Sequence, residues 1–143
     1  SQFRARGTFF NLQGRTWAQV TENERQAMGK IRAESHKKLF QHKASFEENK
    51  RILQEFVSFL YAHDVTPIVA ITPFTPEYDC FVLNEMKESV LELVDGVQED
   101  EHYVDFNENA ADLFIPSNFM DTGHLSASGA KKVSNILAEM FGA

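Results

Sequence analysis

The sequence predicts an α/β fold in which helices flank a parallel sheet. Two short apolar segments, VTPIVAIT at 65–72 and HYVDF at 102–106, have the composition of buried strands. A helical pattern lies between them, from Val82 to Val94. The order strand, helix, strand implies a right-handed crossover that joins two parallel strands.

Composition predicts one soluble globular domain. The 143 residues are 43% hydrophobic and 12% aromatic, which is enough for one sizeable core. The net charge of -7 argues against sequence-independent nucleic-acid binding, which needs clustered Lys and Arg. No apolar run has the length of a membrane span, and Cys80, the single cysteine, excludes an internal disulfide.

Residues 1–44 are predicted to form an irregular segment followed by a surface helix. The first twenty residues lack periodicity, and their aromatic side chains, Phe9, Phe10 and Trp17, are interpreted as packing anchors. The stretch TENE then places Glu24 three residues after Thr21, a capping box that starts a polar helix running towards His42.

Residues 45–143 are predicted to form the main α/β unit. In SFEE, Ser45 and Glu48 make a second capping box. The helix that follows is expected to pack on a sheet or another helix through side chains at helical spacing: Ile52, Leu53, Phe56, Val57, Phe59 and Leu60.

Two further helices complete the predicted unit. The helix from Val82 to Val94 has one apolar face and ends at Gly96, a residue typical of helix C-termini. The last helix begins after Ser126 and stops at Gly142. Its predicted inward residues are Val133, Ile136, Leu137, Met140 and Phe141.

Two loops follow the carboxyl ends of the predicted strands, which is where open α/β sheets bind ligands. They run from Thr72 to Asp79 and from Asp105 to His124. The second contains Asp121 and His124 in MDTGHLS. A carboxylate beside an imidazole can orient a catalytic base. The same pair could also be half of a metal site or an ordinary turn before a helix.

A metal site at Asp121 and His124 would need further ligands, and the sequence does not indicate any. None of the other histidines, His36, His42, His63 and His102, makes a familiar ligand spacing. The stretch DFNENAADLFIP resembles a calcium loop, but Ala110 replaces the required Gly and Pro116 the required Glu. We therefore predict no metal.

No serine lies in a recognisable nucleophile motif, and phosphate-binding loops are absent. Ser126 and Ser128 lie near His124 in the sequence, but Ser126 is better placed to cap the final helix. Neither is predicted to be a nucleophile.

Three stretches together carry a resemblance to a known family. FMDTGHLSASGAKKVSNIL resembles the last conserved block of the SGNH (GDSL-like) hydrolase and acyltransferase superfamily. VTPIVAITPFTPEY and YVDFNENAADLF resemble the preceding strands and loops of the branch that modifies cell-surface polysaccharide and teichoic acid. The resemblance covers roughly residues 45–143 and implies a flavodoxin-like fold.

The resemblance also implies roles for particular residues. His124 would be the general base and Asp121 the carboxylate that orients it, in ester hydrolysis or O-acyl transfer by a serine. Thr72, Phe74 and Tyr78 become candidate substrate-binding residues. No cofactor is implied, the substrate would be an acylated carbohydrate, and an extracytoplasmic location would follow.

The family's serine block and oxyanion-hole blocks are not found in the sequence. The chain therefore resembles the C-terminal portion of such a domain, with the first strands missing, and we expect little activity from it alone. It is expected to be either part of a longer protein or a natural remnant. The alternative function is a non-catalytic α/β interaction module. Because two strands leave sheet edges uncovered, we expect the N-terminal segment, self-association or strand exchange to compensate.

Overall fold

The computed structural model describes residues 12–96, 102–108 and 111–142. It is a mixed α/β fold, mostly helical, with a small parallel sheet. The sheet pairs β1 (Val69–Ile71) with β2 (Tyr103–Asp105), with Val69 opposite Tyr103 and Ile71 opposite Asp105. The predicted parallel strand pair is thus confirmed, and within the described residues the sheet has these two strands.

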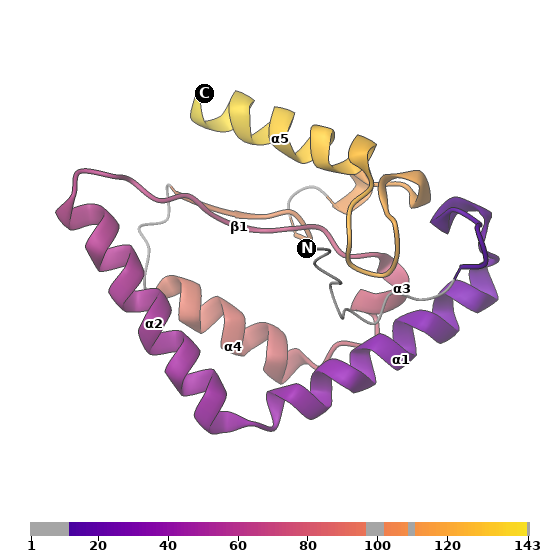
Figure 1. Ribbon diagram of the computed structural model, residues 1–143, viewed down its shortest axis with the longest axis horizontal. Coiled ribbons are helices and arrows are strands. Elements are labelled where there is room, and N and C mark those ends of the chain that lie inside the picture. Colours follow the sequence, from indigo (N-terminus) through magenta and orange to yellow (C-terminus); the bar gives the residue numbers. More distant parts are fainter. Residues whose placement is uncertain (1–11, 97–101, 109–110, 143) are drawn as a thin grey trace, which may run out of the picture.

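The helices are arranged around the sheet in two groups (Figure 1). Helix α5 (Ala127–Phe141) lies over one side of the sheet, and α4 (Asn84–Asp95) lies on the other side. Helices α1 (Glu22–Phe40) and α2 (Lys43–Ala62) form an open V around α4. Short helical segments complete the described chain: η1 (Trp17–Gln19), α3 (Pro76–Asp79), η3 (Ala111–Leu113) and η4 (Pro116–Asn118).

The hydrophobic core lies between α5, the sheet and the segments that flank them. Its buried members are Trp17, Val104, Phe106, Phe114, Phe119 and Val133. The prediction that Trp17 is a packing anchor is confirmed, since 1% of its surface is exposed. Phe9 and Phe10 lie outside the described residues. The segment before α1 therefore supplies part of the core.

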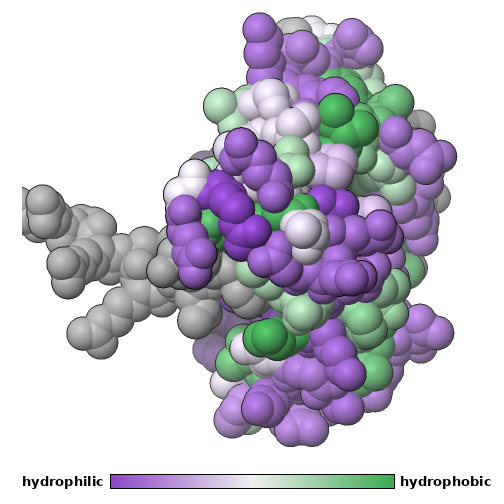
Figure 2. All heavy atoms as spheres, turned by 90° about the vertical axis from the view of Figure 1, so that its right-hand side faces the viewer, coloured by the Kyte–Doolittle hydropathy of each residue, from purple (hydrophilic) through white to green (hydrophobic). Residues whose placement is uncertain are grey.

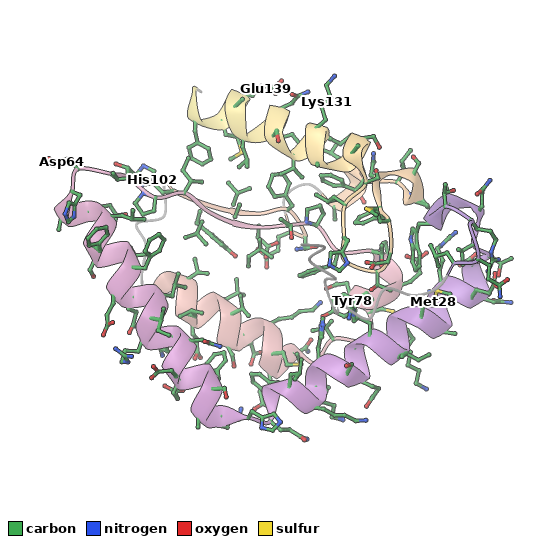
Figure 3. The ribbon with its side chains drawn as sticks, viewed as in Figure 1. Met28, Asp64, Tyr78, His102, Lys131 and Glu139 are labelled. Atoms are coloured by element: carbon green, nitrogen blue, oxygen red, sulfur yellow. The ribbon has the colours of Figure 1, made fainter. Side chains whose placement is uncertain are left out.

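Helix α5 follows its predicted pattern with one exception. Ser126 caps its first turn by accepting a hydrogen bond from the Gly129 amide, and Gly142 ends it in the left-handed conformation. Ile136, Leu137 and Phe141 pack against the core. Met140 was expected to point inward, but 55% of it is exposed because the helix turns that position away. Figure 3 shows Lys131 and Glu139 on the outer side of α5.

The start of α2 differs from the prediction. His42, not Ser45, is the residue before the first turn, and the Ser45 amide already donates to the His42 carbonyl at 3.1 Å. The Glu48 carboxylate accepts from Arg51 at 2.8 Å and does not reach back to the backbone of Ser45. An ion pair on the exposed face has therefore replaced the second capping box.

The apolar face of α2 is largely uncovered, contrary to the prediction that it packs on a sheet or helix. Val57 is buried, but Ile52, Phe56 and Phe59 are 49%, 55% and 56% exposed. β1 is also only half buried, although its composition predicted a buried strand, and Ile68 before it is 44% exposed. The two described strands are too few to cover a twenty-residue helix. Apolar faces therefore remain uncovered within the described residues, as expected for a sheet of two strands.

Helix α4 ends as predicted but starts later. It runs from Asn84 to Asp95 and is capped by the predicted Gly96, whose amide donates to the Glu92 carbonyl at 3.1 Å. Of its predicted apolar face, Val94 is buried and Val90 is 40% exposed. Val90 lines a pocket of about 230 Å³ between α4 and the sheet, so this space is only partly filled.

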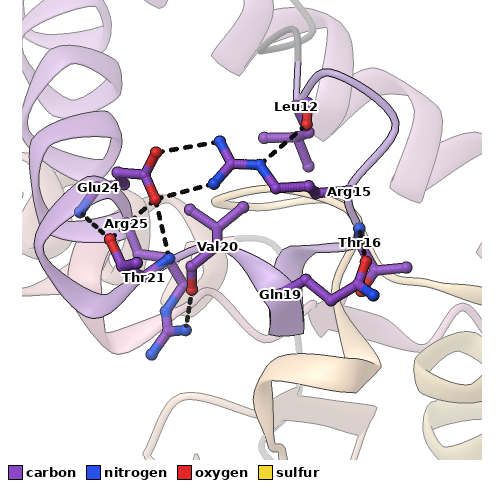
Figure 4. A network of polar contacts seen from close by, with 8 residues as sticks. All are labelled: Leu12, Arg15, Thr16, Gln19, Val20, Thr21, Glu24 and Arg25. Carbon is purple, nitrogen blue, oxygen red and sulfur yellow. Dashed lines mark hydrogen bonds and ion pairs between the residues drawn. The ribbon is translucent and has the colours of Figure 1, made fainter.

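Helix α1 begins at the predicted capping box. Thr21 Oγ1 accepts from the Glu24 amide, and the Glu24 carboxylate accepts from the Thr21 amide at 3.0 Å (Figure 4). Arg15 adds a bidentate pair to the same carboxylate, with both N–O distances 3.0 Å. The helix ends at Phe40 and is not simply a surface helix, because Gly29 and Ala33 are buried. The face of the molecule in Figure 2 is mostly polar, with small separate apolar patches.

The hydrogen bonds to the Glu24 carboxylate predict a lowered pKa for this residue. Hydrogen bonds from Arg15, and then from Thr21, lower the pKa of Glu24 from 4.5 to about 2. The stabilising contribution of this carboxylate is therefore present above pH 4.5 and lost as the pH falls through about 2. In an NMR titration we expect the Glu24 midpoint near 2 in the wild type and higher in Arg15→Gln, whereas Lys30→Gln, on the same helix, leaves it unchanged. An unchanged midpoint in Arg15→Gln would contradict this account.

Candidate active site

The two loops at the carboxyl edge of the sheet are tied together by one side chain. Asn107, two residues after β2, accepts from the Phe74 amide at 2.7 Å and donates to the Thr72 carbonyl at 3.1 Å. Asp105 holds this amide group in place by accepting from Asn107 Nδ2 at 3.0 Å. The loop after β1 is therefore fixed to the end of β2.

The Asp121–His124 loop docks on the same edge. The Thr75 amide and Oγ1 both donate to the Thr122 carbonyl, at 3.1 and 3.0 Å. An antiparallel bridge between Phe119 and Leu125 closes the base of this loop. The expectation that the two loops converge is thus met by direct bonds between them.

Asp121 and His124 face each other. His124 Nδ1 lies 2.8 Å from Asp121 Oδ2 and 2.9 Å from Oδ1. The Asp121 carboxylate also accepts the backbone amides of Gly123 and His124, each at 2.9 Å. A short polar side chain bonded to the amides that follow it stabilises a tight turn, so this loop positions the pair locally. The side-chain contact predicted from the sequence is confirmed.

The two side chains of the pair are buried to different extents. The Asp121 side chain is 3% exposed, whereas that of His124 is 51% exposed. A carboxylate only accepts hydrogen bonds, so Nδ1 carries the hydrogen in this contact and Nε2 is the nitrogen that can take up a proton. The arrangement is the one that a general base and its orienting carboxylate require.

Residues that sequence reasoning did not select lie beside His124. A small pocket of about 170 Å³ is lined by Phe74, Tyr78, Thr122, Gly123 and His124, together with Arg32 and His36 of α1. Figure 3 shows Tyr78 where α3 meets α1. Arg32 and His36 are one helical turn apart, but nothing in the sequence of α1 indicates that it meets this loop.

The three candidate substrate-binding residues have different positions. Phe74 and Tyr78 line the small pocket and also a more apolar one of about 230 Å³ between α4 and the sheet. The apolar wall of the second pocket comes from Ile71, Val82, Met86, Val90 and Leu91. Thr72 is exposed, lines neither pocket, and contributes its carbonyl to Asn107.

The hydroxyl groups of the serines near His124 are hydrogen-bonded to the segment before α5 and to each other. Ser126 Oγ donates to the Ser117 carbonyl at 2.8 Å and lies 2.9 Å from Ser128 Oγ. Asn118 Nδ2 donates to Ser128 Oγ at 3.2 Å. These bonds fix the start of α5 on η4, which agrees with the interpretation of Ser126 as a helix cap.

Neither a metal-binding cluster nor a membrane-spanning helix occurs in the described ranges. No group of three or more His, Cys, Asp or Glu side chains there is arranged to hold a metal ion. Nor does any helix there combine the length and apolarity needed to span a membrane.

Comparison of the chain with protein-family models, with curated proteins and with solved structures finds no match. The resemblance to the SGNH superfamily therefore rests on the quoted sequence stretches.

Proposed function

We propose that the chain is the base-bearing part of a flavodoxin-like SGNH-type serine esterase or O-acyltransferase that acts on acylated carbohydrate. One observation carries the proposal: His124 Nδ1 is held by the buried Asp121 carboxylate, at 2.8 Å, on the carboxyl edge of a parallel sheet. In this chemistry His124 removes a proton from a serine hydroxyl during attack on the ester carbonyl and returns it to the leaving alcohol.

The neighbouring pockets support a divided substrate site. Phe74 and Tyr78 stand between the pocket at His124 and the apolar pocket beneath α4. An acyl chain suits the apolar side, since burying its methylene groups is favourable by about 0.8 kcal/mol each. The carbohydrate would then remain on the polar, more accessible side near His124.

The nucleophile is the missing component. The 143 residues contain no serine in a recognisable nucleophile motif. The pair would therefore need a serine and oxyanion donors from a partner or a further chain segment. Alone, it can only use its base to activate water, which is slower.

Removal of His124 tests the proposal. We expect the wild-type chain to hydrolyse an activated acetyl ester slowly, and His124→Ala to lower this rate at least about tenfold, because a positioned base typically contributes 10²–10⁴-fold. Asp121→Asn should also lower the rate by disturbing the orientation of the imidazole. The measurement is the initial rate of phenolate release from an aryl acetate at neutral pH.

His42→Ala is the matched control for the histidine variants. His42 is exposed at the start of α2, so its loss should leave the rate unchanged. Circular dichroism and thermal unfolding verify that each variant is folded. Equal rates in the wild type and His124→Ala would overturn the proposal.

A second candidate is a non-catalytic interaction module. It is favoured by the exposed apolar face of α2 and by the two-strand sheet, which has edges open to pairing within the described structure. If His124 makes no contribution to hydrolysis, this candidate explains the molecule better.

A further inference from the structure

The small pocket beside His124 has an unusual lining for an acidic protein. Arg32 and His36 enter it from α1, Tyr78 from α3, and His124 from the loop before α5. Its volume of about 170 Å³ compares with about 30 Å³ for one water molecule in the liquid. It can therefore hold one small polar group, not an entire oligosaccharide.

Arg32 supplies a fixed positive charge to this pocket. Its side chain is half-buried, and among the described residues no carboxylate pairs with it. The other described arginines, Arg15, Arg25 and Arg51, each pair with a glutamate. A guanidinium that lines a pocket without its own counterion is available to an external anion.

The side chains beside Arg32, Tyr78 and His36, are hydrogen-bonded to each other. Tyr78 Oη lies 2.6 Å from His36 Nδ1. Burial, followed by the charge of Arg32, lowers the pKa of His36, and burial raises the pKa of Tyr78. At neutral pH His36 is therefore uncharged and Tyr78 keeps its hydroxyl hydrogen, so neither adds a negative charge.

Two described carboxylates beside the pocket, Asp121 and Asp79, already have bonding partners. Asp121 is bonded to His124 and to two backbone amides. Asp79, next to Tyr78, is paired with Lys87 at 2.8 Å. Among its described lining residues, the pocket thus has one arginine without a carboxylate partner and no unpaired carboxylate.

We propose that this pocket binds a single anionic group, a carboxylate or a phosphate, on the molecule that His124 acts on, with Arg32 as the main anchor. The link to the substrate of His124 rests on the proposed function, whereas binding of the anion does not. The planar guanidinium matches either group, because two parallel N–H donors can bond two of its oxygens. The net charge of -7 disfavours anion binding on the rest of the surface. An anion would therefore bind selectively in this pocket.

Binding can be measured by NMR on chain labelled in its histidine side chains. The probes are inorganic phosphate and acetate, then glucose 6-phosphate, glucuronate and uncharged glucose at constant ionic strength. We expect saturable shifts of the His36 and His124 ring signals with the anions and none with glucose. Tighter binding of glucose 6-phosphate or of glucuronate would identify which anionic group the pocket prefers.

Two variants of Arg32 and one control separate the pocket from general charge effects. Arg32→Gln should weaken binding at least about tenfold, and Arg32→Lys should weaken it less, because it keeps the charge but loses the two parallel donors. Lys30→Gln removes the same charge from an exposed position on the same helix and should leave binding unchanged. Absence of saturable shifts, or equal affinity in Arg32→Gln and the wild type, would overturn the inference.

The experiments can refute either proposal without refuting the other. If the anions bind through Arg32 but His124→Ala hydrolyses esters at the wild-type rate, the anion pocket stands and the catalytic proposal falls. If His124 contributes to hydrolysis but no anion binds, the catalytic proposal stands and the anion pocket is rejected.

Discussion

Gly29→Ala is expected to destabilise the protein by at least about 3 kcal/mol, because it forces apart two backbones that are in direct contact. A Cβ at position 29 would lie 1.9 Å from the Glu77 carbonyl oxygen and 2.9 Å from the Tyr78 amide nitrogen. Backbone atoms cannot rotate away as the end of a side chain can, so α1 and α3 must separate.

The separation would also affect the candidate site. Tyr78 belongs to α3 and bonds His36 of α1 at 2.6 Å, across the interface that Gly29 holds close. In a Gly29→Ala protein that remains folded, we expect this bond to break and the ring signals of His36 to shift. Urea unfolding at neutral pH gives the free energy of unfolding for the variant and the wild type.

Gly123→Ala is the matched control for this substitution. A Cβ there would have Phe74 Cδ1 as its nearest neighbour, at 3.8 Å, an ordinary contact. Its free energy of unfolding should remain within about 1 kcal/mol of the wild type. Equal stability of Gly29→Ala and Gly123→Ala would mean that α1 and α3 are not in direct backbone contact at Gly29.

Local sequence signals predicted the parts of the fold that neighbouring residues determine. Thr21 and Glu24 form their capping box, Ser126 caps the last helix, and Asp121 reaches His124 within one turn. Each of these contacts joins residues three positions apart, so the sequence contains both partners side by side.

Contacts between distant segments were not predictable in the same way. Nothing in α1 indicated that Arg32 and His36 would line the pocket at His124, since that depends on α3 packing against Gly29. Periodicity likewise identified the apolar face of α2 but not what covers it, and Phe56 remains 55% exposed. A hydrophobic pattern shows which side a helix can bury, whereas burial requires a partner.

The ion pair between Arg25 and Glu77 is the second strong constraint between α1 and α3. Arg25 Nε donates to Glu77 Oε1, with side-chain exposures of 15% and 10%. The same guanidinium donates to the Val20 carbonyl at 2.8 Å, so it joins three segments. Arg25→Met should cost about 3–5 kcal/mol, because it leaves the Glu77 carboxylate buried without its partner.

A double-mutant cycle distinguishes the lost pair from a lost side chain. Arg25→Met combined with Glu77→Met should recover most of the stability, since well-packed apolar residues can replace a buried pair at little cost. Arg51→Met is the exposed control, because Arg51 and its partners Glu48 and Glu55 are more than half exposed. It should cost less than about 1 kcal/mol.

Urea unfolding at neutral pH measures all four proteins of the cycle and the control. A double variant no more stable than Arg25→Met would mean that the methionines fail to pack and that the cost is steric. Equal losses in Arg25→Met and Arg51→Met would mean that burial of the Glu77 carboxylate contributes nothing. Only recovery in the double variant, with a small loss in the control, supports a buried charge that needs its partner to hold α3, and with it Tyr78, against α1.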